Sequence, residues 1–385
     1  MTASIKKFVV LFSICIGLFG CGNGYRQQGK VETTPMGHLK DVFKHDFLVG
    51  AAVNEQLIAG KDSLGLTLVI GDYNAISPEN VMKWMYIHPE PESFYFGMTD
   101  KYIDFGLKNN LYIVGHTLVW HSQLPDYLNE VKDSFLMAQY LENHINTLVT
   151  RYEGKLDAWD VVNEALNEDG TLRRSIFSKY LGDNYIGMAF ALAAKADPEV
   201  KLIYNDYNLW KPLKRKAVLR LVRQLQAKGI KIDGIGLQGH WSLKGPPLEE
   251  IEKSIVAFSD LGLKVHITEL DITVLPNPWD LEGAEISQNF DGSSIMNPYK
   301  DRIPDSIQNA LANRYQDVFR LFLKHSDKID RVTFWGINDQ VSWLNDWPIK
   351  GRTNYPLLFD RKYKAKIAYD SIIALKKEIA SLYLN

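Results

Sequence analysis

Eight short apolar runs with the composition of β-strands alternate along this chain with amphipathic segments that repeat like helices. The strand-like runs are residues 47–53, 74–77, 111–120, 156–164, 200–208, 234–241, 264–272 and 331–339. The clearest helical segments are residues 135–152, 214–228, 248–261 and 307–324. Such alternation predicts a parallel sheet, and eight units favour closure into a barrel over an open doubly wound sheet. The sequence also lacks a glycine-rich dinucleotide fingerprint, so we expect an α/β protein with one (β/α)8 TIM-barrel domain.

The first residues have the pattern of an export signal. Lys6 and Lys7 precede an apolar run, residues 8–19, which is too short for a membrane span and typical of a signal-peptide core. The segment from Leu18 to Cys21 resembles a bacterial lipobox, in which the cysteine becomes the lipidated first residue of the mature protein. Phe19 is bulkier than that pattern usually has, and an ordinary cleaved signal is the alternative.

These features predict three parts of the chain. We expect a signal peptide at residues 1–20, a lipidated N-terminus with a flexible tether at residues 21–37, and the barrel at residues 38–385. The only other cysteine, Cys15, lies inside the predicted signal. The prediction is therefore an exported lipoprotein, anchored through Cys21 to a membrane of the bacterial cell envelope.

The balance of charged residues argues against some classes of binding partner. The chain has 44 Lys and Arg residues against 46 Asp and Glu residues, a net charge of −2, and it has no basic block. Neither a nucleic acid nor an anionic membrane surface is therefore an evident partner, apart from the lipid anchor. We expect the protein to act as a monomer.

Polar and aromatic residues gather at the ends of the predicted strands. In (β/α)8 barrels the active site lies at the carboxyl ends of the strands, so this is the pattern of a site. The residues are His116, Trp120, Asn163, Glu164, residues 205–208, Gln238, His240, Glu269, Asp271, Trp335 and Asp339. Most pairs within one strand have even spacing and should share a face.

Two carboxylates define the chemistry. In residues 264–272 the alternation of strand faces predicts that Val265, Ile267, Glu269 and Asp271 share one face. Glu164 ends another strand directly after Asn163, and both can face the site only if the strand ends or bulges there. Acids at the ends of two strands of one sheet are what glycoside hydrolysis requires: one protonates the leaving oxygen, and the other attacks or activates water.

At these residues the chain resembles the endo-1,4-β-xylanases of glycoside hydrolase family 10. The resemblance covers nearly the whole barrel and rests on seven blocks in family order: residues 79–84, 115–123, 159–164, 204–208, 236–240, 267–271 and 334–343. It implies cleavage of internal β-1,4-xylosidic bonds of xylan and xylo-oligosaccharides, with retention of configuration through a covalent glycosyl-enzyme.

The resemblance also implies roles for individual residues. Glu164 would be the acid/base and Glu269 the nucleophile, with His240 and Asp271 orienting Glu269 and Asn163 bonding the sugar 2-hydroxyl. The implied substrate-binding residues are Glu79, Asn80, Lys83, His116, Trp120, Gln123, Gln238, Trp335 and Trp343, with Tyr207 and Asn208 on the leaving-group side. The loop at residues 273–305 either walls that side or is a variable surface loop.

Two other functions are compatible with a barrel. A glycan-binding barrel that does not cut its ligand would not need both Glu164 and Glu269. A metal-dependent hydrolase is disfavoured because none of the nine histidines forms a His-x-His pair, and His116 and His121 have an odd spacing. We therefore expect neither a metal nor another cofactor.

Overall fold

The computed structural model describes residues 37–279, 281 and 283–382. The predicted signal peptide, Cys21 and nearly all of the tether lie outside these residues. No helix in the described part of the chain is both long and apolar enough to span a bilayer.

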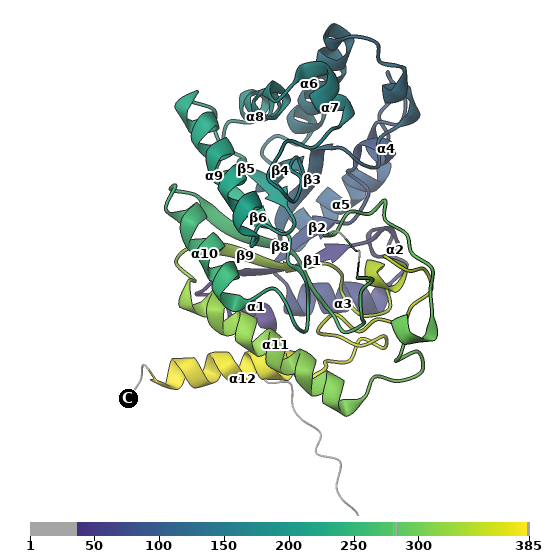
Figure 1. Ribbon diagram of the computed structural model, residues 1–385, viewed down its shortest axis with the longest axis vertical. Coiled ribbons are helices and arrows are strands. Elements are labelled where there is room, and N and C mark those ends of the chain that lie inside the picture. The colour runs from purple at the N-terminus through teal and green to yellow at the C-terminus, as the bar shows by residue number, and fades with distance from the viewer. Residues whose placement is uncertain (1–36, 280, 282, 383–385) are drawn as a thin grey trace, which may run out of the picture. The chain divides into compact units, whose positions relative to one another are not determined.

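Eight parallel strands close into a barrel (Figure 1). The nine strands of the sheet are β1 (Leu48–Val53), β2 (Ala75–Pro78), β3 (Tyr112–Trp120), β4 (Ala158–Asn163), β5 (Lys201–Asp206), β6 (Gly234–Leu237), β7 (His240–Ser242), β8 (Lys264–Thr273) and β9 (Ile329–Phe334). Each of β1 to β5 pairs with the next strand, β6 pairs with β8, and β9 pairs with both β8 and β1. The short β7 continues the path of β6 along β8. The predicted (β/α)8 barrel is confirmed.

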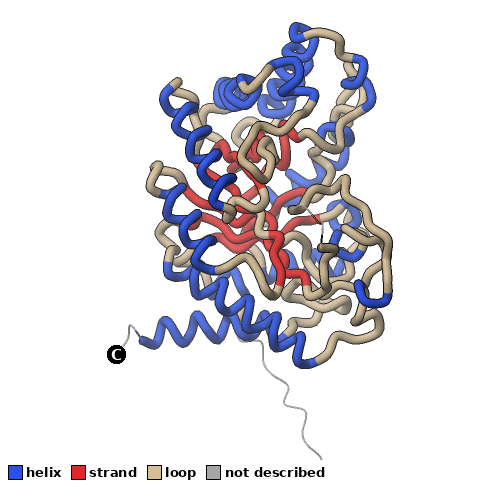
Figure 2. Tube along the Cα trace, viewed as in Figure 1, coloured by secondary structure: helices blue, strands red, loops and turns tan. Residues whose placement is uncertain are grey.

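Helices surround the strands, as the tube in Figure 2 shows. They are α1 (Leu39–Val42), α2 (Glu55–Ile58), α3 (Ser63–Asp72), α4 (Trp84–Ile87), α5 (Gly97–Lys108), α6 (Ser134–Arg151), α7 (Ile176–Leu181), α8 (Asn184–Ala196), α9 (Pro212–Ala227), α10 (Leu248–Ser259), α11 (Asp305–Lys324) and α12 (Ile367–Leu382). The four helices predicted above are confirmed as α6, α9, α10 and α11, with ends shifted by a few residues.

Helix α6 illustrates why these segments are helical. The Asp133 carboxylate accepts a hydrogen bond from the backbone N–H of Leu136 and so caps the first turn. Leu141, Ile145 and Leu148 follow at helical spacing and are fully buried. The sequence therefore determines both the start of the helix and the face that packs on the barrel.

Small residues inside the barrel leave room for the polar side chains of the site. A Cβ atom added at Gly236 in β6 would lie only 2.2 Å from Oδ1 of Asn205, a fully buried residue of β5. Any larger residue at position 236 would thus displace Asn205. Glycine at this position allows an amide side chain to cross the interior of the barrel.

Irregular strand ends bring the predicted residues into one place. Strand β4 ends at Asn163 after a register shift between Asp160 and Val162, and Glu164 has a φ of 57°. The predicted irregularity at Asn163 and Glu164 is confirmed. Because of it, two consecutive side chains reach the same side.

Two of the predicted alternations are wrong. In β8 the register shifts between Ile267 and Leu270, and the consecutive residues Thr268 and Glu269 both hydrogen-bond Asn205. Strict alternation from Val265 to Asp271 is therefore broken. Strand β9 ends at Phe334, so Asp339 does not share a strand face with Trp335 and instead forms a buried ion pair with Lys366.

Candidate active site

A cleft of about 680 Å³ lies at the carboxyl ends of the barrel strands. Every catalytic and substrate-binding residue that the resemblance implied lines it, except Asp271, Tyr207 and Asn208. Of the other polar residues at the predicted strand ends, Asn205, Asp206 and Asp339 do not line it. Further lining residues that the sequence did not single out include Gln340 and Trp347. The structure thus gathers residues from across the sequence around one opening.

Glu164 lies buried in the wall of this cleft. Its Oε2 accepts a 2.8 Å hydrogen bond from Nε1 of Trp120, and its Oε1 accepts a 2.9 Å bond from Nε2 of Gln238. Burial raises the pKa of Glu164, and this effect outweighs the lowering by the charge of His121 and by the two hydrogen bonds. The carboxyl group therefore holds its proton to a higher pH than an exposed glutamate.

Glu269 is also buried, but its surroundings favour the opposite state. Nδ2 of Asn205 donates a 2.7 Å hydrogen bond to Oε1, and Nε2 of His240 lies 3.1 Å from Oε2. Burial alone would raise the pKa of Glu269, but the hydrogen bond from His240, the charges of His116 and His240 and the bond from Asn205 lower it overall. Glu269 is therefore ionised at neutral pH.

His240 links Glu269 to Asp271. Its Nδ1 lies 3.0 Å from Oδ1 of Asp271, whose Oδ2 accepts a 2.8 Å hydrogen bond from Nε1 of Trp343. Burial lowers the pKa of His240, but the charges and hydrogen bonds of Asp271 and Glu269 raise it to about 10. The protonated ring donates to both carboxylates, and Asp271, which is fully buried, acts from behind His240 rather than in the cleft.

An amide network connects the two glutamates. Oδ1 of Asn163 accepts hydrogen bonds from Nδ2 of Asn205 at 2.9 Å and from Nε2 of Gln238 at 3.3 Å. Gln238 also bonds Glu164, and Asn205 also bonds Glu269. The sequence placed Asn205 among the polar residues at a strand end, as part of residues 205–208, but predicted no role for it.

Comparison with known proteins shows the family of this chain. The model of glycosyl hydrolase family 10 matches residues 38–375. The chain belongs to glycosyl hydrolase family 10.

Three relatives resemble it along nearly their whole length. The chain is 41% identical over 342 residues to endo-1,4-beta-xylanase A of Xylanibacter ruminicola. The alignment covers 88% of this chain and 93% of that protein. A GH10 endoxylanase from a sugarcane soil metagenome has 44% identity and a TM-score of 0.85, over 88% of this chain and 99% of that one. Xylanase 10B of Thermotoga petrophila RKU-1, solved with xylobiose, has 29% identity and a TM-score of 0.78. The match covers 89% of this chain and 98% of that one.

One side of the family 10 cleft is lined by Glu79, Asn80 and Lys83. Nζ of Lys83 donates a 2.9 Å hydrogen bond to Oδ1 of Asn80 and lies 4.9 Å from the centre of a Trp120 ring. Burial raises the pKa of Glu79, although the charge of Lys83 opposes this rise. Burial lowers the pKa of Lys83, although the charge of Glu79 opposes this fall. These groups offer donors and acceptors beside the aromatic faces of the cleft.

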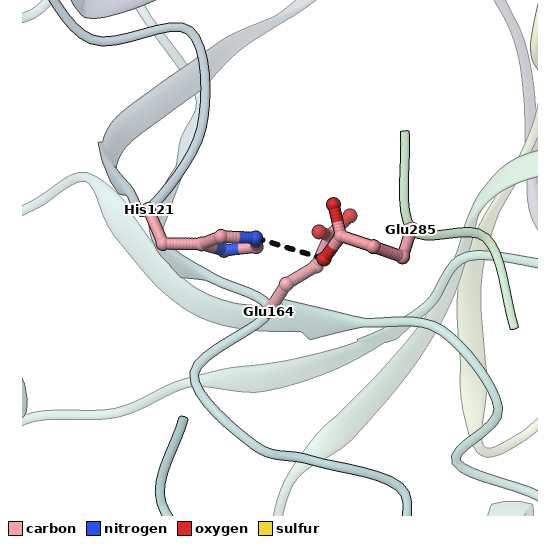
Figure 3. Close-up of side chains that lie close together, drawn as sticks. All are labelled: His121, Glu164 and Glu285. Atoms are coloured by element: carbon pink, nitrogen blue, oxygen red, sulfur yellow. Dashed lines mark hydrogen bonds and ion pairs between the residues drawn. The ribbon is translucent and has the colours of Figure 1, made fainter. Parts of the chain in front are cut away.

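A third carboxylate, Glu285, lies close to Glu164 (Figure 3). Its Oε2 lies 3.0 Å from Nε2 of His121 and accepts a 2.7 Å hydrogen bond from Nη1 of Arg173. Burial raises the pKa of Glu285, but the hydrogen bond and charge of His121, with Arg173, lower it to about 2. The sequence did not predict this contact because the loop at residues 273–305 brings Glu285 to Glu164 from a distant part of the chain.

His121, Glu164 and Glu285 are also the one group in the described residues that could hold a metal ion, with potential ligand atoms within 4.8 Å of one another. The guanidinium of Arg173 already binds the Glu285 oxygen that faces His121. A metal ion at this place would compete with that cation, so the donor set fits an ion pair better than a metal centre.

The predicted leaving-side residues lie beyond Glu164. Tyr207 lines a second hollow of about 450 Å³, together with Arg173 and Glu285, and its hydroxyl accepts a 2.5 Å hydrogen bond from Nη2 of Arg173. Nε of Arg173 donates to the backbone carbonyl of Glu164 at 3.0 Å. Asn208 lines neither hollow and donates a 3.1 Å bond to Oε2 of Glu168.

Proposed function

We propose that this family 10 protein is a retaining endo-1,4-β-xylanase in which Glu164 is the acid/base and Glu269 the nucleophile. The observation that supports these roles best is the pair of buried glutamates with opposite pKa shifts. A protonated and an ionised carboxyl group in one cleft are what the first step of retaining glycoside hydrolysis requires. The substrates are xylan and xylo-oligosaccharides.

In the first step, Glu164 gives its proton to the glycosidic oxygen while Glu269 attacks the anomeric carbon. The bond between that carbon and the leaving oxygen breaks, and an ester bond to Glu269 forms. His240 and Asp271 hold Glu269 ionised and oriented, because the protonated imidazole donates to both carboxylates. Trp120 and Gln238 hold the carboxyl group of Glu164 in place.

In the second step, Glu164 acts as a base. Its carboxylate takes a proton from water, the water oxygen attacks the anomeric carbon, and the ester bond to Glu269 breaks. Two displacements at one carbon restore its original configuration. Asn163, held by Asn205 and Gln238, bonds the sugar 2-hydroxyl, a contact that strengthens in the transition state.

The substrate chain is held along the cleft. The part of the substrate on the non-leaving side is bound by Glu79, Asn80, Lys83, His116, Trp120, Gln123, Trp335 and Trp343. Gln238 is a further substrate-binding residue, and all nine line the cleft. Tyr207 acts on the leaving-group side, and Asn208 supports that side through Glu168.

Proton NMR of early products tests the reaction directly. Xylohexaose in deuterated buffer should first give the β-anomer at the new reducing end, with the α-anomer appearing only by mutarotation. Cleavage should occur at internal bonds, so mid-length products should precede xylose. An initial α-anomer would show inversion, and xylose as the first product would contradict endo action.

We also propose that the mature protein is a monomer anchored by lipid on Cys21 to the bacterial cell envelope. The support is the sequence alone: Lys6 and Lys7, the apolar run that follows them, and the lipobox-like segment ending at Cys21. Growth with labelled palmitate should mark the wild type and leave Cys21→Ser unlabelled and soluble. Label in Cys21→Ser would contradict the proposal. Light scattering of the soluble variant should give the mass of one chain.

A further inference from the structure

A separate polar hollow, distinct from the one that Tyr207 lines, lies at the other end of the barrel from the active site. It has a volume of about 380 Å³ and lies at the amino ends of the strands. The exposed Lys44, Lys201 and Lys264 lie at its rim, and the inner residues include Tyr112, His266 and Arg331. This end of a (β/α)8 barrel usually contributes to stability rather than catalysis, and the barrel interior is usually apolar. A charged interior here therefore calls for a physical explanation.

Arg331 is the most unusual residue of this hollow. It is the third residue of β9, and only 1% of its surface is exposed. None of its three guanidinium nitrogens has a hydrogen-bond partner, and the residue has no ion pair, within the described residues. Arginine stays charged in proteins and offers five N–H donors. A buried charge without a partner is strongly unfavourable, so a hydrogen-bond acceptor beside the guanidinium would stabilise the folded protein.

Three other buried polar atoms of the hollow also lack a hydrogen-bond partner: the hydroxyl of Tyr112, Nδ1 of His266 and Oδ2 of Asp46. The Asp46 oxygen nevertheless lies in an ion pair, 2.7 Å from Nζ of Lys376, which leaves the Tyr112 and His266 atoms without any partner among the described residues. The Tyr112 ring centre lies 5.7 Å from Cζ of Arg331, and His266 is the register partner of Arg331 across β8 and β9. Burial and the charge of Arg331 lower the pKa of His266 to about 3, so its ring is neutral and can offer one N–H. Three side chains can therefore donate at the same place.

The acids of the hollow do not supply the missing acceptor. Each is paired with lysine: Asp330 with Lys201 at 3.1 Å and Lys264 at 3.5 Å, Asp46 with Lys376 at 2.7 Å, and Asp327 with Lys328 at 2.7 Å. Lys44 at the rim has no ion pair among the residues described. The positive charge of Arg331 therefore stays unbalanced, and the rim is open to an anion from solution.

We propose that this hollow binds a small tetrahedral oxyanion, such as inorganic phosphate or sulfate. The planar guanidinium of Arg331 would bind two of its oxygens, and the Tyr112 hydroxyl and His266 would donate to the others. A volume of about 380 Å³ is ample for such an ion. The anion is a structural ligand of the barrel floor and takes no part in hydrolysis.

Calorimetric titration of the mature protein with sodium phosphate tests this site, with ionic strength held constant by sodium chloride. The wild type should show saturable binding to one site, and phosphate should raise its melting temperature beyond the effect of chloride. Arg331→Met should lose both effects. Arg352→Met, which removes another buried arginine that binds the carbonyls of Pro276 and Trp347, should keep both. No saturable binding by the wild type, or equal binding by Arg331→Met, would overturn the proposal.

Tyr112→Phe gives a second test if Arg331→Met does not fold. Loss of one donor to the anion should lower the phosphate affinity by about fivefold or more, with xylan hydrolysis unchanged. Without an anion, the hydroxyl is a buried group that lacks a partner, and its removal should only raise stability. A phosphate affinity that does not change in Tyr112→Phe would contradict the assignment of this hydroxyl and of the site.

Discussion

The indole N–H of Trp120 donates a 2.8 Å hydrogen bond to Oε2 of Glu164. The donor stabilises the ionised carboxylate and therefore opposes the burial that raises the pKa of Glu164. An aromatic residue of the sugar-binding cleft thus also adjusts the proton affinity of the proposed acid. Hydrolysis needs Glu164 protonated and Glu269 ionised. Activity should therefore decrease when the pH rises above the raised pKa of Glu164, and also when the pH drops below the lowered pKa of Glu269.

Trp120→Phe should move the alkaline limb of the activity profile to higher pH. The variant removes a bond that lowers the pKa of Glu164, so the protonated acid persists further up the pH scale. The shift in kcat/KM against pH should be about one unit or less, with a lower maximum because Trp120 also lines the cleft. An alkaline limb that moves to lower pH would contradict this account of Glu164.

Trp343→Phe is the matched control for that experiment. Trp343 lines the same cleft, but its indole donates to Asp271 instead of Glu164. The variant should lose activity through substrate contact while its alkaline limb stays in place.

Glu269→Ala should lose nearly all activity, on the order of 10,000-fold, because no nucleophile remains. External azide should then restore some turnover and give a glycosyl azide of inverted configuration, because the small anion occupies the space of the missing carboxylate. Mass spectrometry and NMR identify this product.

Glu142→Ala, which removes an exposed glutamate of α6, should behave like the wild type and give no azide product. A retained azide product from Glu269→Ala, or a loss of only about tenfold, would mean that Glu269 is not the nucleophile.

Lys366→Met should lower the free energy of unfolding by about 3 to 5 kcal/mol, because it leaves the buried Asp339 carboxylate without its cation. Nζ of Lys366 lies 2.9 Å from Oδ2 of Asp339 and donates to the carbonyls of Tyr355 and Leu357. Urea unfolding followed by tryptophan fluorescence measures the change. Lys377→Met, an exposed change on α12, should stay within about 0.5 kcal/mol of the wild type. Equal stability of both variants would contradict a structural role for this ion pair.

The sequence was sufficient to predict the barrel and most of the cleft. Strand periodicity identified the eight strands, and polar residues at their ends identified the side of the barrel that carries the cleft. The adjacent pair Asn163 and Glu164 even required the irregular strand end that the structure contains. These predictions succeeded because they depend on local pattern and on the direction of parallel strands.

The remaining features depend on contacts that no local pattern contains. Glu285 reaches Glu164 through a loop with no regular period, and Arg173 joins the two only in the folded chain. The register shift in β8 places Thr268 and Glu269 together, against strict alternation. Asp339 resembled a residue of the cleft because β9 was expected to extend five residues further than it does.

The central claim, that Glu164 is the acid/base, is tested most directly by Glu164→Ala with two substrates. The leaving group of xylan is a sugar alcohol, which departs poorly without a proton, whereas nitrophenolate departs without one. The variant should therefore lose far more activity on xylan than in the first step with nitrophenyl xylobioside. Without the base the glycosyl-enzyme should accumulate, seen as a burst of nitrophenol, and azide should speed its breakdown to a glycosyl azide of retained configuration. Equal losses on both substrates, with neither a burst nor an effect of azide, would contradict the role of Glu164.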